Sequence, residues 1–374
     1  MEIEGEAAHL FLYDVGGELD LKKAEEALRK PPQFVKFEER LPFPRYVRMT
    51  PYPLFLRLDE RQLGVPVRVQ VRLHHIGAIS VVFRYSFACH IRELPRYGRA
   101  VVTTPKGEFE LASLGDEIRA AIEERIGSCI VRIYQREPVP EEYTAIAIRR
   151  LGTPYTAEAF LRKYGRLVAA MLREEEDPDE LSDSEVMEAL RETQSFYRES
   201  ARVIDWGATF ILEPKREYES DLLIAELANL QLLELRVYDR ILDAKIDAVY
   251  DDVRRVLRVG RHRFWPSHSV EKVAAEVSEI EADLAQVLSD IRNVTKFVGD
   301  WDLARYYRSL TRRFHLDDWE KAVQQKLETV RHIYTLVMDK AGHERSETLE
   351  ILVILLILVE VALSLLSYGG FIRR

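Results

Sequence analysis

Residues 349–372 read LEILVILLILVEVALSLLSYGGFI, and this stretch decides how the chain is organised. Its only charged residues are Glu350 and Glu360, and apolar residues cover every face of the helix that it would form. The length suits the ~20 residues that cross a ~30 Å hydrocarbon core. With about −0.4 kcal/mol for each Leu, Ile and Val and about +3 kcal/mol for Glu360, insertion is favourable by roughly 2 to 3 kcal/mol. We therefore expect a C-terminal transmembrane helix.

The two acids within this helix are its most informative positions. An ionisable group at bilayer depth is costly and usually faces a protein partner or water, so Glu350 and Glu360 are predicted membrane-helix contacts. A protonated Glu360 could donate a hydrogen bond to a neighbouring helix and favour a homo-oligomer. Two alternatives stay open. Glu360 could be tolerated without a role, and the whole segment could be a buried core helix or an apolar oligomer seam.

The position of the apolar segment predicts a topology. A large domain precedes it and almost nothing follows, which is typical of a single-pass, tail-anchored protein with residues 1 to ~345 in the cytosol. The first residues, MEIEGEAAHLFLYD, are acidic and contain neither a secretory signal nor an Arg-rich transit peptide. We therefore expect a membrane location, with the bilayer as the first partner.

Residues 221–345 show helical periodicity and predict an antiparallel coiled-coil hairpin followed by a third helix. Apolar residues recur at three-and-four spacing in two long series, one for each arm of the hairpin, and in a third series for the helix that follows. This is the pattern of a heptad seam. A short turn around Gly260 and Pro266 separates the two arms, each roughly 45 Å long at 1.5 Å per residue. The three series are Ala228, Leu232, Leu235, Leu242, Ile246, Val249, Val253 and Val256, then Val270 to Val298, then Val323, Leu327, Val330, Tyr334, Val337 and Ala341.

Residues 1–175 read as a small mixed α+β domain, because short β-type runs alternate with turns and helices. VRVQVRL (67–73) alternates with period two and predicts a hairpin with 79–87 across the turn at Gly77. Residues 176–220 follow as an acidic connection, EEEDPDELSD from 174 to 183, and one more strand at 201–212. Further expected strands are 9–14, 129–134 and 143–148, and expected helices are 21–30, 114–126 and 156–173.

Composition excludes several classes of protein. The 374 residues are 47% hydrophobic and 31% charged, so the chain has enough apolar surface to fold and is not globally disordered. The net charge of −9 argues against a protein that coats nucleic acid with its whole surface. The two cysteines, Cys89 and Cys129, imply no disulfide framework in a chain of this size.

The C-terminal part of the chain resembles a known family. The segment HERSETLEILVILLILVEVAL (343–363) is similar to the C-terminal signature of proteins named for being required for meiotic nuclear division. In that pattern a Leu-Glu pair opens an Ile/Leu-rich stretch, as Leu349 and Glu350 do here, and a Glu-Val pair follows ten residues later, as Glu360 and Val361 do. The resemblance implies an oligomeric integral membrane protein. Eukaryotic members lie in the mitochondrial inner membrane and support translation, and no catalytic residues carry over.

A basic tip is expected where the two coiled-coil arms meet. RRVLRVGRHRFW (254–265) concentrates arginines beside aromatic residues in an otherwise acidic chain. Arginine with aromatic residues suits phosphate, base, lipid-headgroup or protein contact, so RNA is one alternative partner among several. A solvated tip that pairs with the acids of 174–183 is the simpler alternative. The residues of this basic tip are Arg254, Arg255, Arg258, Arg261, Arg263 and Trp265.

Metal, cofactor and enzyme hypotheses have less support in the sequence. No P-loop, GxGxxG or GxSxG is present, and His74, His75, Cys89 and His90 lack the spacing of metal ligands. We therefore expect no cofactor and no metal. The favoured function is a membrane-anchored oligomeric scaffold or tether that engages a protein partner. The alternative is a membrane-bound hydrolase acting at the α+β domain, with carboxylates drawn from Asp205, Glu213, Glu217 and Asp221.

Overall fold

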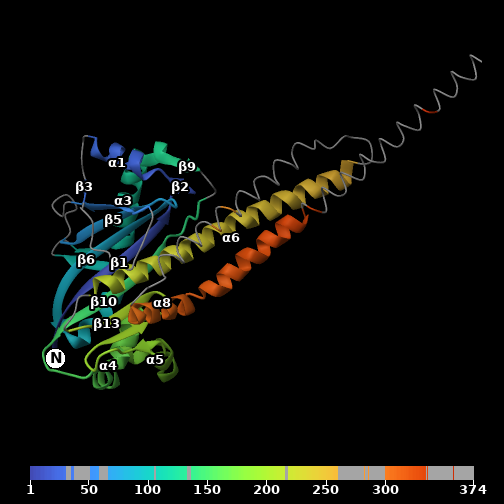
Figure 1. Ribbon diagram of the computed structural model, residues 1–374. Helices are drawn as coiled ribbons and strands as arrows, with labels where there is room; N and C mark the ends of the chain where they lie inside the picture. Colours follow the sequence, from blue (N-terminus) through green and yellow to red (C-terminus); the bar gives the residue numbers. More distant parts are fainter. Residues whose placement is uncertain are drawn as a thin grey trace, which may run out of the picture. The chain divides into compact units, whose positions relative to one another are not determined.

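The computed structural model describes most of the chain in eight segments. They are residues 1–30, 35–37, 51–58, 66–104, 107–132, 136–214, 218–259 and 300–333, with the isolated positions 282, 285, 335 and 357. Contacts within the chain define two compact units, Met1–Ile241 with Leu284–Ala322, and Leu242–Asp283 with Val323–Arg374. The first unit contains the sheet, and the second is helical where it is described (Figure 1).

The first unit is built on a nine-stranded sheet with β1 (Glu2–Asp14) in the middle. β1 pairs antiparallel with β6 (Ala78–His90) on one side and with β10 (Glu141–Leu151) on the other. The partner strands are rich in the β-branched and aromatic residues that favour pleated structure. The other strands extend the sheet to its edges: β5 (Arg68–His74), β4 (Leu54–Leu58) and β3 (Val35–Phe37) beyond β6, and β13 (Ala208–Leu212), β12 (Ala201–Ile204) and β11 (Thr193–Gln194) beyond β10.

The predicted hairpin around Gly77 is confirmed. β5 and β6 pair antiparallel, and His74 opposite Ala78 closes the turn. Gly77 has φ +83°, a conformation that glycine adopts at little steric cost. Its carbonyl oxygen accepts a hydrogen bond from the backbone nitrogen of Val15 at 2.9 Å, and a Cβ added at Gly77 would lie 1.8 Å from the carbonyl oxygen of Gly16. The turn therefore requires glycine.

One face of the sheet is covered by three of the expected helices. α1 (Leu21–Arg29) and α3 (Leu111–Ile126) pack over one half, in an apolar cluster that includes Phe83. α4 (Ala157–Leu172) packs over the other half, in a second cluster that includes Phe210. Each helix presents one apolar stripe to the sheet.

The opposite face of the sheet is covered by the first part of α6 (Glu219–Val259). Side chains alternate between faces along a strand, so Arg72 and Arg84 point away from the apolar clusters that their neighbours join. Both are buried against α6: Arg72 pairs with Glu226, and Arg84 Nη2 lies 2.6 Å from an oxygen of Glu219. The first unit is therefore a three-layer arrangement of helices, sheet and helix.

Short elements complete the described part of the chain. Two small sheets lie outside the main one, and each pairs two short strands antiparallel. The acids from 174 to 183 are mostly exposed, as expected for a solvated connection. The short elements are β2 (Glu18–Leu19) with β9 (Ile130–Arg132), β7 (Val101–Thr104) with β8 (Gly107–Glu110), α5 (Asp183–Ala189), α8 (Trp301–Arg313), and the 3-10 helices η1 (Ile91–Gly98), η2 (Gly127–Cys129) and η3 (Pro178–Glu180).

The sequence-based reading of residues 176–220 differs from the structure in two respects. The stretch 201–212 forms two antiparallel strands, β12 and β13, and not one strand, because the chain turns at Asp205, Trp206 and Gly207. β13 then pairs in parallel with β10, so the sheet continues across the boundary that we placed at residue 175. The physical reason is that β13 completes the apolar cluster under α4.

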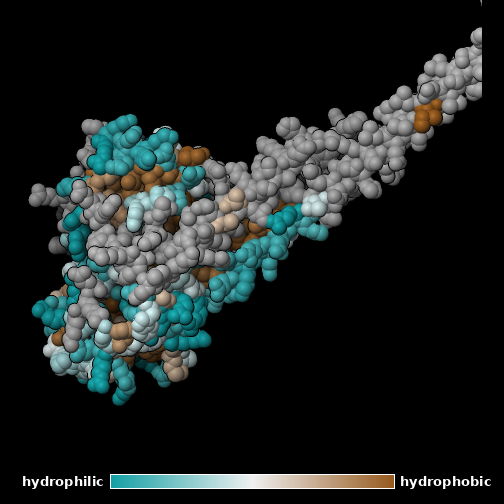
Figure 2. Space-filling model, viewed as in Figure 1, coloured by the Kyte–Doolittle hydropathy of each residue, from teal (hydrophilic) through white to brown (hydrophobic). Residues whose placement is uncertain are grey.

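The second unit contains the later part of α6 and part of helix 316–333. Lys326 Nζ lies 2.6 Å from Asp243 Oδ1, so these two helices lie side by side there. Val323, Leu327 and Val330 of the third predicted series are buried, while Figure 2 shows a hydrophilic outer side of helix 316–333. The predicted second arm, 270–298, lies outside the described residues except for positions 282 and 285. The coiled-coil hairpin therefore stays a prediction.

The membrane prediction also falls outside the described residues. Within the described part, no helix is both long enough and apolar enough to cross a membrane. Residues 349–372, with Glu350 and Glu360, are not described except for Ile357. The transmembrane helix therefore stays a prediction.

We expect Gly77→Ala to lower the free energy of unfolding by about 2 kcal/mol or more. The added Cβ meets the backbone at Gly16 and the residue loses its tolerance of positive φ. The measurement is urea unfolding of the full-length protein followed by tryptophan fluorescence. Gly127→Ala is the matched control, because Gly127 has φ −54° and an added Cβ would meet nothing within 4 Å. Equal effects of both changes would contradict this account of the turn.

Candidate functional site

The β12–β13 hairpin carries a polar cluster at each end. Asp205 lies at the turn, while Arg202 and Glu213 lie near the open end, where β12 begins and β13 stops. Both ends face α8, whose sequence position is about a hundred residues later. The hairpin therefore brings together charged residues that are far apart in the chain.

The open end of the hairpin borders a polar pocket of about 160 Å³. It lies between β12, the end of β13, the start of α6 and the start of α8, all within the first unit. Apolar residues contribute part of the wall, and most of the surface that faces the pocket is polar. The lining residues that matter for its chemistry are Gln194, Phe196, Arg202, Glu213, Asp221, Asp300 and Asp302.

Arg202 is the central cation of this pocket. Its Nε lies 2.5 Å from Asp221 Oδ1, and its Nη1 donates to Asp302 Oδ2 at 2.7 Å. The guanidinium also lies over the ring of Tyr306, 5.2 Å from the ring centre. One arginine therefore connects α6 and α8 to the edge of the sheet, which is a geometry that a planar guanidinium suits.

Asp221 is the most perturbed acid of the pocket. Burial raises its pKa from the ordinary 3.8 to about 6, although the nearby Arg202 favours the charged form. The carboxylates of Asp302 and Glu213 raise the pKa further, because like charges disfavour ionisation. Asp300 is used differently: its side chain accepts a hydrogen bond from the backbone nitrogen of Leu303 and caps α8.

Aromatic side chains form a partly exposed rim beside the pocket. The Phe196 ring lies 5.2 Å from the ring of Trp301 and 4.4 Å from that of Tyr197. Phe196 is 41% exposed and Trp301 60%, which is high for large apolar residues. The guanidinium carbon of Arg305 lies 5.3 Å from the centre of the Trp301 ring. One aromatic face of the rim is therefore already in contact with a cation.

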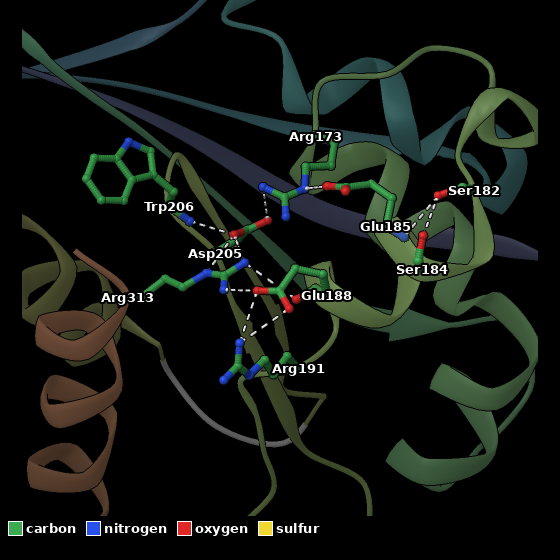
Figure 3. A network of polar contacts seen from close by, with 9 residues as sticks. All are labelled: Arg173, Ser182, Ser184, Glu185, Glu188, Arg191, Asp205, Trp206 and Arg313. Carbon is green, nitrogen blue, oxygen red and sulfur yellow. Dashed lines mark hydrogen bonds and ion pairs between the residues drawn. The ribbon is translucent and has the colours of Figure 1, made fainter. Parts of the chain in front are cut away.

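The turn end of the hairpin holds a denser ion-pair network (Figure 3). Asp205 is fully buried, and its oxygens lie 3.0 Å from Arg173 Nη1 and 2.8 Å from Arg313 Nε. It also accepts a hydrogen bond from the backbone nitrogen of Trp206 at 2.8 Å. Arg313 pairs in addition with Glu188. Because Asp205 is enclosed by its partners, it is committed to holding α4, α8 and the hairpin together.

A third set of buried polar residues lies between the sheet and α6. His74 Nε2 lies 2.9 Å from Ser80 Oγ and 3.6 Å from Glu226, which resembles a nucleophilic trio in residue types. The arrangement does not suit catalysis, because the same histidine nitrogen faces both partners and Ser80 is inaccessible to substrate. Burial lowers the pKa of His74 to about 3, so this histidine is neutral near neutral pH.

The structure places the sequence-predicted site residues in different locations. Glu213 and Asp221 meet at the pocket, Asp205 lies at the other end of the hairpin, and Glu217 lies outside the described residues. Arg202 and Asp302 were missed; a lone arginine inside the apolar run ARVI was the available signal. The basic tip lies at or beyond the end of α6: the side chains of Arg254, Arg255 and Arg258 and all of Arg261, Arg263 and Trp265 are not described.

The candidate metal ligands are also separated. His74 contacts Ser80, and His90 Nε2 lies 2.8 Å from the N-terminal nitrogen of Met1. Burial raises the pKa of the Cys89 thiol to about 11, which disfavours the thiolate that binds metal. Within the segments that the structure describes, no three His, Cys, Asp or Glu side chains are placed to hold a metal ion.

Comparison with known proteins identifies the family of the sheet-containing part. The family model described as "Uncharacterized protein MJ0711, N-terminal domain" matches residues 4–219, more than half of the chain. The chain belongs to this family. The match begins in β1, spans the complete nine-stranded sheet and ends at the first residue of α6. It therefore includes both ends of the β12–β13 hairpin, whereas α8 lies beyond it.

One curated relative is the uncharacterized protein MJ0711 of Methanocaldococcus jannaschii. It is 23% identical over 232 residues, which are 62% of this chain and 68% of that protein. No solved structure matches the chain.

We expect Asp205→Asn to lower the free energy of unfolding by about 3 kcal/mol. The change leaves the partly buried guanidinium groups of Arg173 and Arg313 without their shared negative charge. Chemical denaturation measures the loss. Arg191→Ala is the control from the same network, because Arg191 is 68% exposed and pairs only with Glu188 in the described network. A loss no larger than that of the control would mean that Asp205 does not hold these elements together.

The pKa of Asp221 predicts a specific dependence of stability on pH. Because its folded pKa, about 6, exceeds the ordinary 3.8, the folded state binds the proton more tightly than the unfolded state. Its contribution to stability should therefore rise as pH falls from about 7 toward 4, by on the order of 2 to 3 kcal/mol. Burial also raises the pKa of other acids, such as Glu141, so the observable is the difference between wild type and Asp221→Asn. Parallel stability–pH curves for the two proteins would contradict the raised pKa.

Proposed function

We propose that this protein is a membrane-anchored, oligomeric scaffold or tether whose α+β domain lies on the cytosolic side and engages a protein partner. The observation that carries the proposal is the length and position of α6. This single helix has 41 residues; its first part belongs to the sheet-containing unit and its remainder to the helical unit. The helical unit is also the one whose chain continues into the apolar segment 349–372.

The attachment of α6 to the sheet supports a tethering role. Three ion pairs connect strands to positions about two to three turns apart on this helix: Arg84 with Glu219, Arg72 with Glu226, and Glu141 with Arg236. Contacts at several depths fix both the rotation and the axial position of a helix. A domain held in this way has a defined position relative to the first part of α6, which is what a tether needs at its attachment point.

The polar clusters favour a scaffold over a hydrolase. Asp205 is enclosed by Arg173 and Arg313, and Asp221 is paired with Arg202. A carboxylate acting as a general base must reach the proton that it abstracts, and neither of these two is placed to do so. Glu213 has no ion pair with a described residue, so it is the carboxylate that a hydrolase at the α+β domain would use. Turnover of a phosphoester by the purified protein, lost in Glu213→Gln, would favour that alternative.

Self-association within the membrane and contacts with lipid or RNA are proposed for residues whose side chains the structure does not describe. Glu350 and Glu360 are the proposed helix contacts within the membrane, and Glu360 would support a homo-oligomer. The basic tip, from Arg254 to Trp265, would supply any contact with phosphate, whether lipid headgroup or RNA. An association with translation follows only from the resemblance to the proteins required for meiotic nuclear division.

Deleting residues 347–374 should release the protein from membranes washed with alkaline carbonate. The deletion removes the complete apolar segment, which is the proposed source of insertion energy. The measurement is the fraction of full-length and deleted protein that sediments with the membranes. If the full-length protein is already soluble after the wash, the apolar segment is not an anchor.

Glu360→Leu is the matched variant for this experiment. It replaces the one acid near the middle of the apolar segment, so the protein should stay with the membranes. Its detergent-solubilised oligomer should be weaker by about 1 to 2 kcal/mol, the scale of a hydrogen bond within the membrane. Light scattering as a function of protein concentration measures the dissociation. Identical dissociation curves would leave Glu360 without a role in assembly.

A further inference from the structure

The pocket beside Arg202 contains more negative than positive charge. Among the residues that the structure describes, four carboxylates line it, those of Glu213, Asp221, Asp300 and Asp302, together with one guanidinium, that of Arg202. Arg305 adds one more positive charge nearby, since it pairs with Asp302 at 3.3 Å. The surplus that remains among these described residues is negative, so they suit a cation.

An unused acceptor in the pocket wall is independent of these carboxylates. Gln194 lines the pocket, is 8% exposed, and its Nε2 donates to Ser309 Oγ at 2.6 Å and to the Arg305 carbonyl at 3.1 Å. These two bonds fix the amide, and its Oε1 accepts no hydrogen bond from a described residue. Buried acceptors are normally satisfied, so an unsatisfied oxygen on a residue of the pocket wall is unusual.

The surroundings favour an organic cation over a metal ion. No three candidate ligands of the described chain are placed to hold a metal, and the guanidinium of Arg202 already pairs with two of the carboxylates, Asp221 and Asp302. Phe196, Tyr197 and Trp301 supply partly exposed aromatic faces at the rim. Aromatic faces attract ammonium and guanidinium groups and also contact an attached alkyl chain.

We propose that this pocket binds an alkylammonium or guanidinium group carried on a short apolar chain. Its volume, about 160 Å³, leaves room for about five non-hydrogen atoms if each takes the roughly 30 Å³ of a water in the liquid. The cation would lie near Glu213, and the apolar chain would contact Phe196. The inference goes beyond the proposed scaffold and does not depend on the membrane anchor.

The acid–base properties of the pocket agree with a cationic ligand. Asp221 faces Arg202, Asp302, Glu213 and Tyr306, and burial with the two neighbouring acids raises its pKa. A bound cation favours the ionised form of each acid, so binding should release protons. Affinity should therefore fall below about pH 6, where Asp221 becomes neutral.

Calorimetric titration of the full-length protein in a non-ionic detergent tests the proposal. The two probes are 1,4-diaminobutane, a free amine, and Nα-acetyl-lysine amide, which presents the same cation as a peptide side chain. Nα-acetyl-norleucine amide, of similar size without the charge, is the neutral control. We expect saturable binding of at least one cationic probe at up to about 20 mM and none of the neutral one. Tighter binding of the lysine amide would identify a protein partner, and tighter binding of diaminobutane a small amine.

Variants make the test specific to the pocket. Glu213→Gln should weaken binding about tenfold or more, because it removes a charged hydrogen-bond acceptor that has no ion pair with a described residue and so should not disturb folding. Glu158→Gln, on the exposed side of α4, is the control and should leave the affinity unchanged. No saturable binding of either cation, or equal weakening by the two substitutions, would overturn the proposal. Loss of the anchor in the carbonate experiment would not affect it.

Discussion

The structure depends on the pairing of charges that are buried between the sheet and α6. Taking an ion out of water costs several kcal/mol, and the cost is recovered only if a partner is held in good geometry. Glu6 shows how this is met: it is 1% exposed and lies against Arg84, with Arg149 at 3.0 Å. Its position on the central strand means that three neighbouring strands contribute to one charge cluster. The helix can lie on this face only when all of these groups find their partners.

Because of this constraint, the buried ion pairs define the position of α6 on the sheet more than they add to the free energy of folding. A wholly apolar interface would tolerate small rotations of α6, because van der Waals contacts are not directional. Ion pairs and hydrogen bonds are directional, and a displaced helix would leave Arg72 or Glu226 buried and unpaired. The ion pair between Asp205, at the β12–β13 turn, and Arg313 should define the position of α8 in the same way. We infer that the ion pairs of the sheet with α6, and those of Asp205 with α8, each allow only one position of the helix.

Local sequence patterns were sufficient for the elements that are stabilised locally. The β5–β6 hairpin has short-range contacts and a glycine turn, and α1, α3 and α4 each have one apolar stripe and a capping or breaking residue near an end. Patterns did not reveal the parallel pairing of β10 with β13, because residues 152–207 separate the strands and period-two alternation is the same for any partner. The turn at Trp206 was missed because apolar residues lie on both sides of it. Only part of the pocket could be predicted from the sequence. Glu213 and Asp221 were predicted as candidate carboxylates. The ion pair of Arg202 with Asp302 was not predicted, because the two residues are a hundred positions apart in the chain.

The central place of β1 has a consequence for how the chain is made. Its two neighbours in the sheet come from residues 78–90 and 141–151, so an apolar strand is synthesised well before either partner exists. At roughly 5–20 residues per second, translation leaves β1 without a sheet for some seconds. During that interval its unpaired edges could pair with other nascent chains. The small residues Ala7 and Ala8 and the polar residues Glu4, Glu6 and His9 interrupt what would otherwise be a continuous apolar run. The charge of Glu6, which later pairs with Arg84, therefore also protects the newly synthesised strand from aggregation.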